Sequence, residues 1–239
     1  MDLVQEPEKA GEEPKTLCSH FTYTLDGPDV CGKQTYVIAA RAGVTKLRWV
    51  VAISDGAEWI RNRFREHFPN CIQVLDWYHA VEHLGNVLRV CLTAALAKSS
   101  PRGKVDETKL KEWCKKLAGV GKTLMIEGKT KQLIKFIKKL PRMTAEAVES
   151  VRQTTGYYLK NIKRMKYNEY LAKGLRIGSG AMESGCKQVA DFRMKRAGMC
   201  WSVDGAMAMG ALRCEFLSTG RWEMLFGGYC GRPRHAASV

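Results

Sequence analysis

An apolar run that ends in an acid constrains the fold of this chain more than any other feature. Residues 49–53 read Trp-Val-Val-Ala-Ile, a continuous apolar stretch of the kind found in strands buried on both faces of a parallel sheet. Asp55 and Gly56 follow almost at once, and a helical apolar pattern then runs to Pro69. Because ligands of open α/β sheets gather outside the carboxyl ends of the strands, Asp55 is predicted to lie at a functional edge.

The pattern around this run predicts an α/β unit. Period-two alternation and short apolar runs indicate strands, and apolar residues at helical spacing between them indicate crossover helices. Strands are expected over residues 20–26, 46–54 and 71–76, and helices over 29–43 and 56–68.

The character of the chain changes after Asp76. No strand pattern recurs for about a hundred residues, and apolar residues at helical spacing predict an all-helical insertion. A glycine-rich turn at 177–180 then begins a helix that carries Glu183. Ser202 is expected to cap a last helix, which ends at Gly220.

Positive charge is concentrated in the helical segment. The formal net charge is +15; residues 98–173 hold twenty Lys/Arg and seven Asp/Glu, net +13, whereas residues 1–17 carry net −3. Such a segment attracts the phosphate backbone of nucleic acids, although charge alone leaves a solvated helical surface as the alternative. The spacing of the tyrosines in this segment favours core packing over base stacking. They are Tyr157, Tyr158, Tyr167 and Tyr170.

Cysteine usage and the amino-terminal residues bear on the compartment. The nine cysteines include no Cys-x-x-Cys pair and most lie in apolar patterns, as free thiols do in a reducing compartment. The first residues have no secretory-signal pattern, and no apolar run reaches the roughly 18 residues needed to span a bilayer. We therefore expect a cytoplasmic protein without membrane contact.

Three acids are candidates for chemistry. Asp55 and Asp76 each follow a predicted strand, and Glu183 begins a late helix. Carboxylates held near one another bind divalent cations, which activate water and stabilise a leaving oxygen in phosphodiester chemistry. Taken singly, Asp55 also suits a helix amino terminus, and Glu183 also suits an exposed ion pair with Lys187.

Asp76-x-x-His79-x-x-x-His83 places an acid and two imidazoles along one predicted helical face. A zinc site needs about four ligands, and no companion of suitable spacing occurs, so a zinc-dependent structural protein ranks last among the hypotheses. Local hydrogen bonding between Asp76 and His79, which stabilises this end of the sheet, is the favoured interpretation. The turn at 177–180 is too short a glycine motif to predict a phosphate site.

Several long motifs follow one another in a fixed order from about His20 to Trp222. They are Asp55-Gly56-Ala57-Glu58-Trp59-Ile60, Phe68-Pro69, Leu75-Asp76-Trp77-Tyr78-His79-Ala80-Val81-Glu82-His83-Leu84, Arg176-Ile177-Gly178-Ser179-Gly180-Ala181-Met182-Glu183-Ser184, Lys195-Arg196-Ala197-Gly198-Met199-Cys200-Trp201-Ser202 and Ala211-Leu212-Arg213. In order and spacing they resemble the catalytic core of ISKra-type bacterial insertion-sequence transposases.

The resemblance implies a DDE transposase. Its fold class would be α/β, a partial RNase H-like catalytic core with an incomplete sheet and a large all-helical insertion. By motif match Asp55 is the second catalytic aspartate and Glu183 the glutamate; both would bind Mg²⁺, of which the intact family uses two ions. Asp76 and His79 take a supporting role. The partner would be DNA, at element ends and target, with a possible homo-oligomer on DNA in the bacterial cytoplasm or nucleoid.

From the resemblance and the distribution of charge, we predict the domain boundaries and the residues that contact DNA. The expected parts are a disordered acidic tail at 1–17, the RNase H-like α/β part at 18–78, the basic helical insertion at 79–173, carboxy-terminal helices at 174–222 and a flexible tail at 223–239. The candidate DNA-binding residues are Lys135, Lys138, Lys139, Lys163, Arg164, Lys166, Lys187, Lys195 and Arg196.

The chain departs from the family pattern at its start. The family's first catalytic aspartate lies on an opening strand, and only one strand is predicted here before the first helix. We therefore expect a fragment truncated at the amino terminus, with weak or no cleavage activity, in which Asp26 is a poor replacement. A non-catalytic DNA-binding module derived from a transposase is the alternative.

Overall fold

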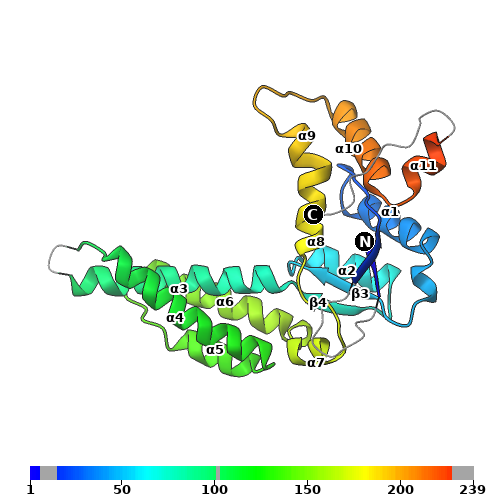
Figure 1. The fold of residues 1–239 in the computed structure, drawn as a ribbon. Helices are drawn as coiled ribbons and strands as arrows, with labels where there is room; N and C mark the ends of the chain where they lie inside the picture. The colour runs from blue at the N-terminus through cyan, green and yellow to red at the C-terminus, as the bar shows by residue number, and fades with distance from the viewer. Residues whose placement is uncertain (6–14, 101–102, 228–239) are drawn as a thin grey trace.

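The computed structural model describes residues 1–5, 15–100 and 103–227, which form a mostly helical protein with two small sheets. A short α/β part lies at the junction of two helical regions, one extended to the side and one above it (Figure 1). The elements before the extended region are β1 (Asp2–Gln5), β2 (Lys15–Ser19), α1 (Pro28–Arg41), η1 (Val44–Lys46), β3 (Val51–Ser54), α2 (Glu58–His67) and β4 (Ile72–Leu75).

The predicted parallel strands on either side of α2 are confirmed. β3 pairs with β4 in parallel, with Val51 opposite Ile72 and Ser54 opposite Leu75. In the described chain this sheet has two strands only. An α/β class therefore holds at the coarse level. The predicted strand over 46–54 begins too early, because η1 and an irregular stretch precede Val51.

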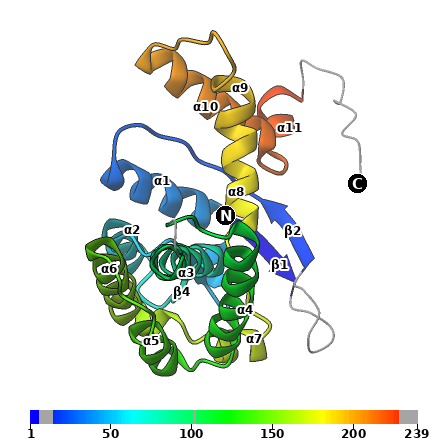
Figure 2. The ribbon, with the colours of Figure 1, turned by 90° about the vertical axis from the view of Figure 1, so that its left-hand side faces the viewer.

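The extended region is a helical arm whose core is continuous with the sheet. The arm consists of α3 (Trp77–Ser99), α4 (Glu107–Ile126), α5 (Thr130–Lys138), α6 (Ala145–Asn161), η2 (Ile162–Arg164) and α7 (Tyr167–Ala172). Seen along the arm, α4, α5 and α6 surround α3 (Figure 2). Leu84, Val87 and Leu88 of α3 are fully buried against Met125, Leu133 and Ile137 of α4 and α5. The prediction that this segment is helical without strands is confirmed for its described residues.

One described helix, α3, is long and apolar enough to meet a length-and-composition test for a membrane span. Its packing inside the arm accounts for that composition. Ala80, Leu84, Val87, Leu88 and Cys91 are all fully buried there. Hydrophobic residues on one face of a helix are expected when neighbouring helices cover it.

The last part of the chain forms a second region, the carboxy-terminal lobe. It comprises α8 (Gly180–Cys186), η3 (Lys187–Asp191), α9 (Phe192–Met194), α10 (Val203–Leu217) and α11 (Arg221–Phe226). The Ser202 side chain accepts from Gly205 N at 3.1 Å, which confirms the predicted cap of α10. Gly220 lies after α10 has ended and caps α11 instead.

Several sequence-based predictions at the ends of the chain are wrong. Residues 2–5 and 15–17 lie in an antiparallel pair, β1 with β2, and not in a disordered tail. The predicted strand over 20–26 pairs with no strand of the part of the chain that the structure describes. This segment packs between α1 and the carboxy-terminal lobe: Thr22 Oγ1 donates to Gln34 Oε1 of α1 at 2.7 Å, and Phe21 N donates to Ser218 Oγ at 2.9 Å. Residues 223–226 are helical. The rest of both predicted tails, 6–14 and 228–239, falls outside the described residues.

Candidate active site and nucleic-acid interface

Asp55 and Asp76 occupy equivalent places after β3 and β4, but their surroundings differ. Asp55 is exposed, whereas Asp76 is fully buried. Asp55 closes a tight turn: its Oδ1 accepts from Ala57 N at 2.9 Å, and Gly56 adopts φ 97°, a conformation that favours glycine. One carboxylate oxygen of Asp55 is thus engaged in the turn, and no side chain or backbone group of the described chain hydrogen-bonds to the other.

Asp76 is a structural anchor with both oxygens engaged. Its Oδ1 accepts from Ser179 N at 2.7 Å, and its Oδ2 accepts from His79 N at 3.2 Å and contacts His79 Nδ1. Trp77 N donates to Ile177 O at 2.9 Å beside it. The predicted local bonding of Asp76 and His79 is confirmed. In addition, Asp76 ties the end of β4 to the turn from which α8 begins.

This tether places the Glu183 helix at the carboxyl end of the sheet. The glycines of the preceding turn allow close packing: a Cβ on Gly178 would lie 2.8 Å from Tyr78 Cε2. Ser179 N is occupied by Asp76, so the turn is not an open phosphate cradle. Glu183 is exposed, and among the described residues it forms no ion pair with Lys187.

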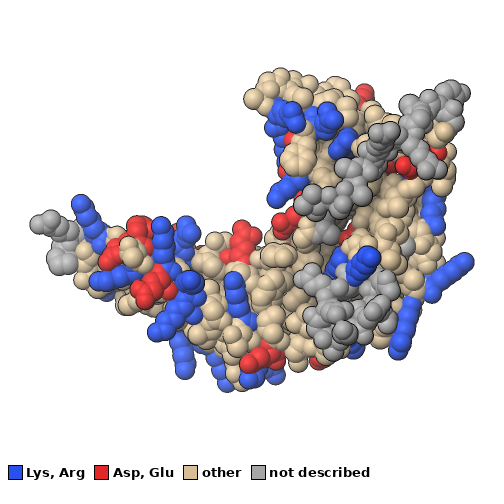
Figure 3. Space-filling view, in the orientation of Figure 1, with Lys and Arg blue, Asp and Glu red and all other residues tan. Residues whose placement is uncertain are grey.

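Acidic side chains gather in the angle between the helical arm and α8 (Figure 3). The elements that meet there carry Asp55, Glu82 and Glu183, all exposed. In the described chain, however, no three His, Cys, Asp or Glu side chains are close enough together to share one cation. The site therefore offers carboxylate oxygens of the kind Mg²⁺ prefers, but not a closed set of protein ligands.

The pKa values of the two imidazoles beside these acids are shifted in opposite directions. The hydrogen bond that His79 makes to the Asp76 carboxylate raises the pKa of His79 above its ordinary value, with a smaller contribution from the charge of Asp55. Burial lowers the pKa of His83, whose ring stacks on Tyr157 at 3.9 Å between centroids. His79 is therefore the more readily protonated of the two. The described residues do not gather His79 and His83 into a zinc site.

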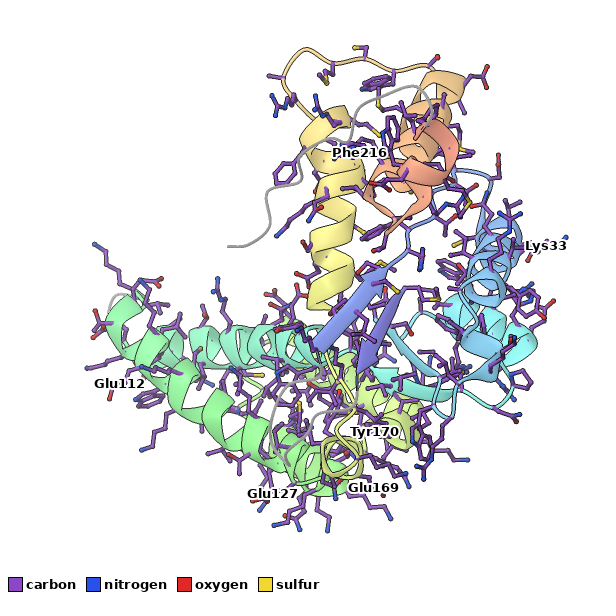
Figure 4. The ribbon with its side chains drawn as sticks, turned by 45° about the vertical axis from the view of Figure 1, so that its right-hand side comes forward. Lys33, Glu112, Glu127, Glu169, Tyr170 and Phe216 are labelled. Carbon is purple, nitrogen blue, oxygen red and sulfur yellow. The ribbon has the colours of Figure 1, made fainter. Side chains whose placement is uncertain are left out.

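Tyrosine hydroxyl groups from the arm donate to backbone carbonyls at the strand ends and in the first turn of α3. Tyr157 donates to Asp55 O at 2.7 Å, Tyr158 to Ala80 O at 2.7 Å and Tyr167 to Leu75 O at 3.0 Å. Tyr158 and Tyr167 are fully buried, and Tyr170 lies beside Glu169 at the junction of the arm with the sheet (Figure 4). The predicted packing role of these tyrosines is confirmed, with hydrogen bonds that aromatic periodicity alone did not indicate.

Arg164, predicted to bind DNA, is instead buried beneath the sheet. Its guanidinium donates to Ser54 Oγ at 2.6 Å, to Val74 O at 3.3 Å and to Asn161 Oδ1 at 3.0 Å. It forms no ion pair with a carboxylate of the described chain, and burial lowers its pKa. The sequence prediction was wrong because the Lys163-Arg164-x-Lys166 run reads as a basic patch, whereas the chain at η2 buries Arg164 and leaves Lys163 and Lys166 exposed.

The other predicted DNA contacts are exposed. Two are already engaged with nearby acids: Lys166 with Glu169 at 3.1 Å, and Lys195 with Asp191 at 2.8 Å. Arg196 Nε donates to Phe192 O at 2.8 Å. The predicted contacts that form no ion pair within the described chain are Lys135, Lys138, Lys139, Lys163, Lys187 and Arg196.

Acids are interspersed among the cations of the arm. Glu112 lies toward the outer end of α4 and Glu127 at its inner end (Figure 4). Asp26, weighed as a substitute acid for the active site, is exposed and bonded to Thr24 Oγ1 at 3.2 Å. Sequence reasoning missed three features: Glu82, whose charge helps to raise the pKa of His79; the Tyr157 contact with Asp55; and Trp49, whose ring has Arg48 and Lys173 each 5.4 Å from its centroid. The i,i+3 spacing of Glu82 from His79 was the one available signal.

Comparison with protein-family models, with curated proteins and with solved structures finds no match to this chain.

Proposed function

We propose that this chain carries part of the RNase H-like core of an insertion-sequence transposase, in which Asp55 and Glu183 serve Mg²⁺-dependent cleavage and transfer of DNA strands. One observation carries the proposal. The buried Asp76 carboxylate accepts from Ser179 N at 2.7 Å and thereby fixes the start of α8, which carries Glu183, to the end of β4. β4 pairs in parallel with β3, the strand that Asp55 follows, so α8 begins at the same edge of the sheet as Asp55.

These carboxylates suit a metal that DNA helps to bind. Mg²⁺ is usually bound through one or two carboxylates together with water and substrate phosphates, so Asp55 and Glu183 would be its protein ligands. The ion would supply Lewis-acid activation of the attacking oxygen and charge stabilisation at the phosphate. Because motif match assigns only two of the family's three catalytic carboxylates, we expect weak or no cleavage by this chain alone. The partner we propose is DNA bound along the arm, by a homo-oligomer of this chain in the bacterial cytoplasm.

The test uses DNA binding, because it reports on the carboxylates even when cleavage is absent. A 30-base-pair duplex of mixed sequence is titrated with the wild-type chain and the Asp55→Asn/Glu183→Gln double variant, in EDTA and in Mg²⁺. Without metal the two carboxylates repel phosphate, so the variant should bind about tenfold more tightly than the wild type. Mg²⁺ should tighten the wild type and remove that advantage.

A matched control separates local from general electrostatics. Glu112→Gln/Glu127→Gln changes the net charge by the same amount on the arm, away from the acidic angle. Its effect on binding should be equal in EDTA and in Mg²⁺. If the Asp55/Glu183 variant behaves like this control, no cation is bound with DNA at the site, and the proposed activity is wrong.

The second candidate is a non-catalytic DNA-binding module. The observation that favours it is the net +13 of residues 98–173, combined with the lack of a preassembled metal group among the described residues. It predicts steeply salt-dependent binding that is indifferent to Mg²⁺ and to Glu183→Ala. The same titration decides between the two functions.

A further inference from the structure

The turn that presents Asp55 lies directly beneath helix α6 of the arm. Tyr157 donates its hydroxyl proton to Asp55 O at 2.7 Å. A Cβ on Gly56 would lie 2.9 Å from Tyr157 Cε2 and 3.2 Å from Asn161 Nδ2, so the backbone approaches these side chains too closely for any other residue. The arm therefore holds the Asp55 peptide in place as well as carrying basic charge.

Tyr157 is itself held from two directions. Its ring stacks on His83 of α3 at an interplanar angle of 24°. Asn161 Nδ2 donates to Tyr157 O at 3.0 Å, one turn further along α6. A hydroxyl on so constrained a ring fixes the position of the carbonyl to which it donates.

We propose that Tyr157 is a positioning residue. It fixes the peptide between Asp55 and Gly56 and so orients the Asp55 carboxylate toward the metal ion that this carboxylate would bind. This inference rests on the proposed function in one respect, because it takes Asp55 to be a metal-binding carboxylate. Removing a side chain that orients a metal ligand commonly weakens metal affinity by about 10- to 100-fold. Tyr157 is expected to act in this way through the Asp55 backbone.

The adjacent residue provides a matched control. Tyr157→Phe removes only the hydroxyl and keeps the ring that packs on His83 and Gly56. Tyr158→Phe removes an equivalent bond of 2.7 Å, to Ala80 O, from the same helix without touching the Asp55 turn. Both variants lose one hydrogen bond, so a purely structural role predicts similar effects for the two.

The first measurement is amide hydrogen exchange, which needs no assumption about function. The Ala57 amide donates its hydrogen bond to Asp55 Oδ1. In Tyr157→Phe this amide should exchange its hydrogen about five- to tenfold faster than in the wild type, the change in rate expected for the loss of one hydrogen bond. Tyr158→Phe should leave that amide unchanged relative to the wild type. Equal exchange rates in Tyr157→Phe and the wild type would overturn the positioning role.

The second measurement is Mn²⁺ affinity, followed by water-proton relaxation. Tyr157→Phe should weaken Mn²⁺ binding about tenfold, and Tyr158→Phe should not. If Asp55→Asn reduces Mn²⁺ affinity but Tyr157→Phe does not, the orientation of the carboxylate by Tyr157 is overturned. If Asp55→Asn has no effect on Mn²⁺, it is the metal-binding role of Asp55 that fails, and the exchange rates alone decide whether Tyr157 fixes the turn.

Discussion

The helical arm and the carboxy-terminal lobe bury their residues in different ways. All members of the main buried cluster lie between Val74 and Tyr170, in the sheet and the arm. Both regions expose some large apolar side chains, but the most exposed ones lie in the lobe: Phe192 is 57% exposed, Val203 68% and Met224 82%. The arm thus has a core of its own, whereas the lobe depends on contacts with other parts of the chain.

Two glycines of the lobe, Gly185 and Gly210, pack against aromatic rings of the segment 20–25. A Cβ on Gly185 would lie 2.5 Å from Phe21 Cε1, and one on Gly210 would lie 2.0 Å from Tyr23 Cδ1. The arm instead packs leucine and isoleucine side chains from several helices against one another. We infer that the arm is stabilised by buried volume, and that the attachment of the lobe is stabilised by the fit of two rings.

The largest effect is expected in the arm core. Leu88→Ala removes a fully buried side chain from the centre of α3 and should lower the free energy of unfolding by about 2–5 kcal/mol. Urea unfolding followed by circular dichroism measures it. Leu212→Ala, at a site 46% exposed on α10, is the counterpart in the lobe and should cost far less. Equal losses would contradict the assignment of the core to the arm.

A smaller effect tests the ring contacts of the lobe. Gly210→Ala places a methyl group against the rigid Tyr23 ring and should destabilise the protein by about 1–3 kcal/mol, typical of overpacking. Because the ring joins the lobe to residues 20–25, protease cleavage in that segment should also accelerate. Unfolding in urea and limited proteolysis provide the two measurements.

Gly119→Ala is the control for helix propensity. Gly119 lies inside α4 with open space around its Cβ position, so alanine there should stabilise by about 1 kcal/mol. If Gly210→Ala were also stabilising, Tyr23 would not occupy the position that the structure gives it. The test is therefore whether Gly210→Ala and Gly119→Ala change the free energy of unfolding in opposite directions.

The difference between the regions also explains where sequence patterns were informative. Leu84, Val87, Leu88 and Cys91 repeat at helical spacing because one face of α3 is covered along much of its length. α10 begins Val-Asp-Gly-Ala-Met-Ala-Met-Gly and its apolar residues are not confined to one face, so its sequence does not show that Gly210 is the contact. Hydrophobic periodicity can reveal which face of a helix is buried, but it cannot reveal that a single glycine packs against one aromatic ring.

The candidate site shows the same limit. Asp55 and Asp76 were identified because strand ends followed by acids are local patterns. Their different burial was not predictable, since it depends on Ser179, which lies far along the chain. Tyr157 was likewise placed in the core by its spacing, while its bond to Asp55 O required the three-dimensional path of α6.

Substitutions at the adjacent residues Lys163 and Arg164 should distinguish an effect on stability from an effect on DNA binding. Arg164→Met removes the bonds to Ser54 and Asn161 but also relieves a buried charge, so the net loss should be about 1–2 kcal/mol. Lys163→Met, at an exposed position, should change stability by less than about 0.5 kcal/mol. If Lys163 contacts a phosphate, its loss should reduce the slope of log affinity against log salt by about 0.9, and Arg164→Met should leave the slope unchanged.

The outcome that contradicts this assignment is a reduced salt slope in Arg164→Met with wild-type stability. Arg164 would then be a surface cation, and the contact of η2 with β3 would be wrong. Fluorescence anisotropy with the same mixed-sequence duplex at several KCl concentrations measures the slope. The arm would in that case contribute charge but no support to the Asp55 strand.

The smallest expected effect is a pH dependence that originates where the arm meets the sheet. The hydrogen bond to Asp76 raises the folded-state pKa of His79 above 6.5, its ordinary value. The folded state therefore favours the protonated imidazole: this stabilisation is fully present below about pH 6.5 and is lost as the pH rises through the folded-state pKa. His83 acts in the opposite direction, because burial lowers its pKa and stability is lost as the pH falls through 6.5.

The two contributions can be separated by substitution. The His79 side chain is 40% exposed, so water screens its pairing with Asp76 and the change in stability should be small. Urea midpoints between pH 5 and 8 should fall more steeply on acidification in His79→Gln than in the wild type, and less steeply in His83→Gln. Asp76→Asn should lower the pKa of His79 in an NMR titration. An unchanged His79 pKa in that variant would mean that Asp76 serves only the backbone of Ser179, and that the imidazole beside the candidate metal site is independent of the anchor that holds α8.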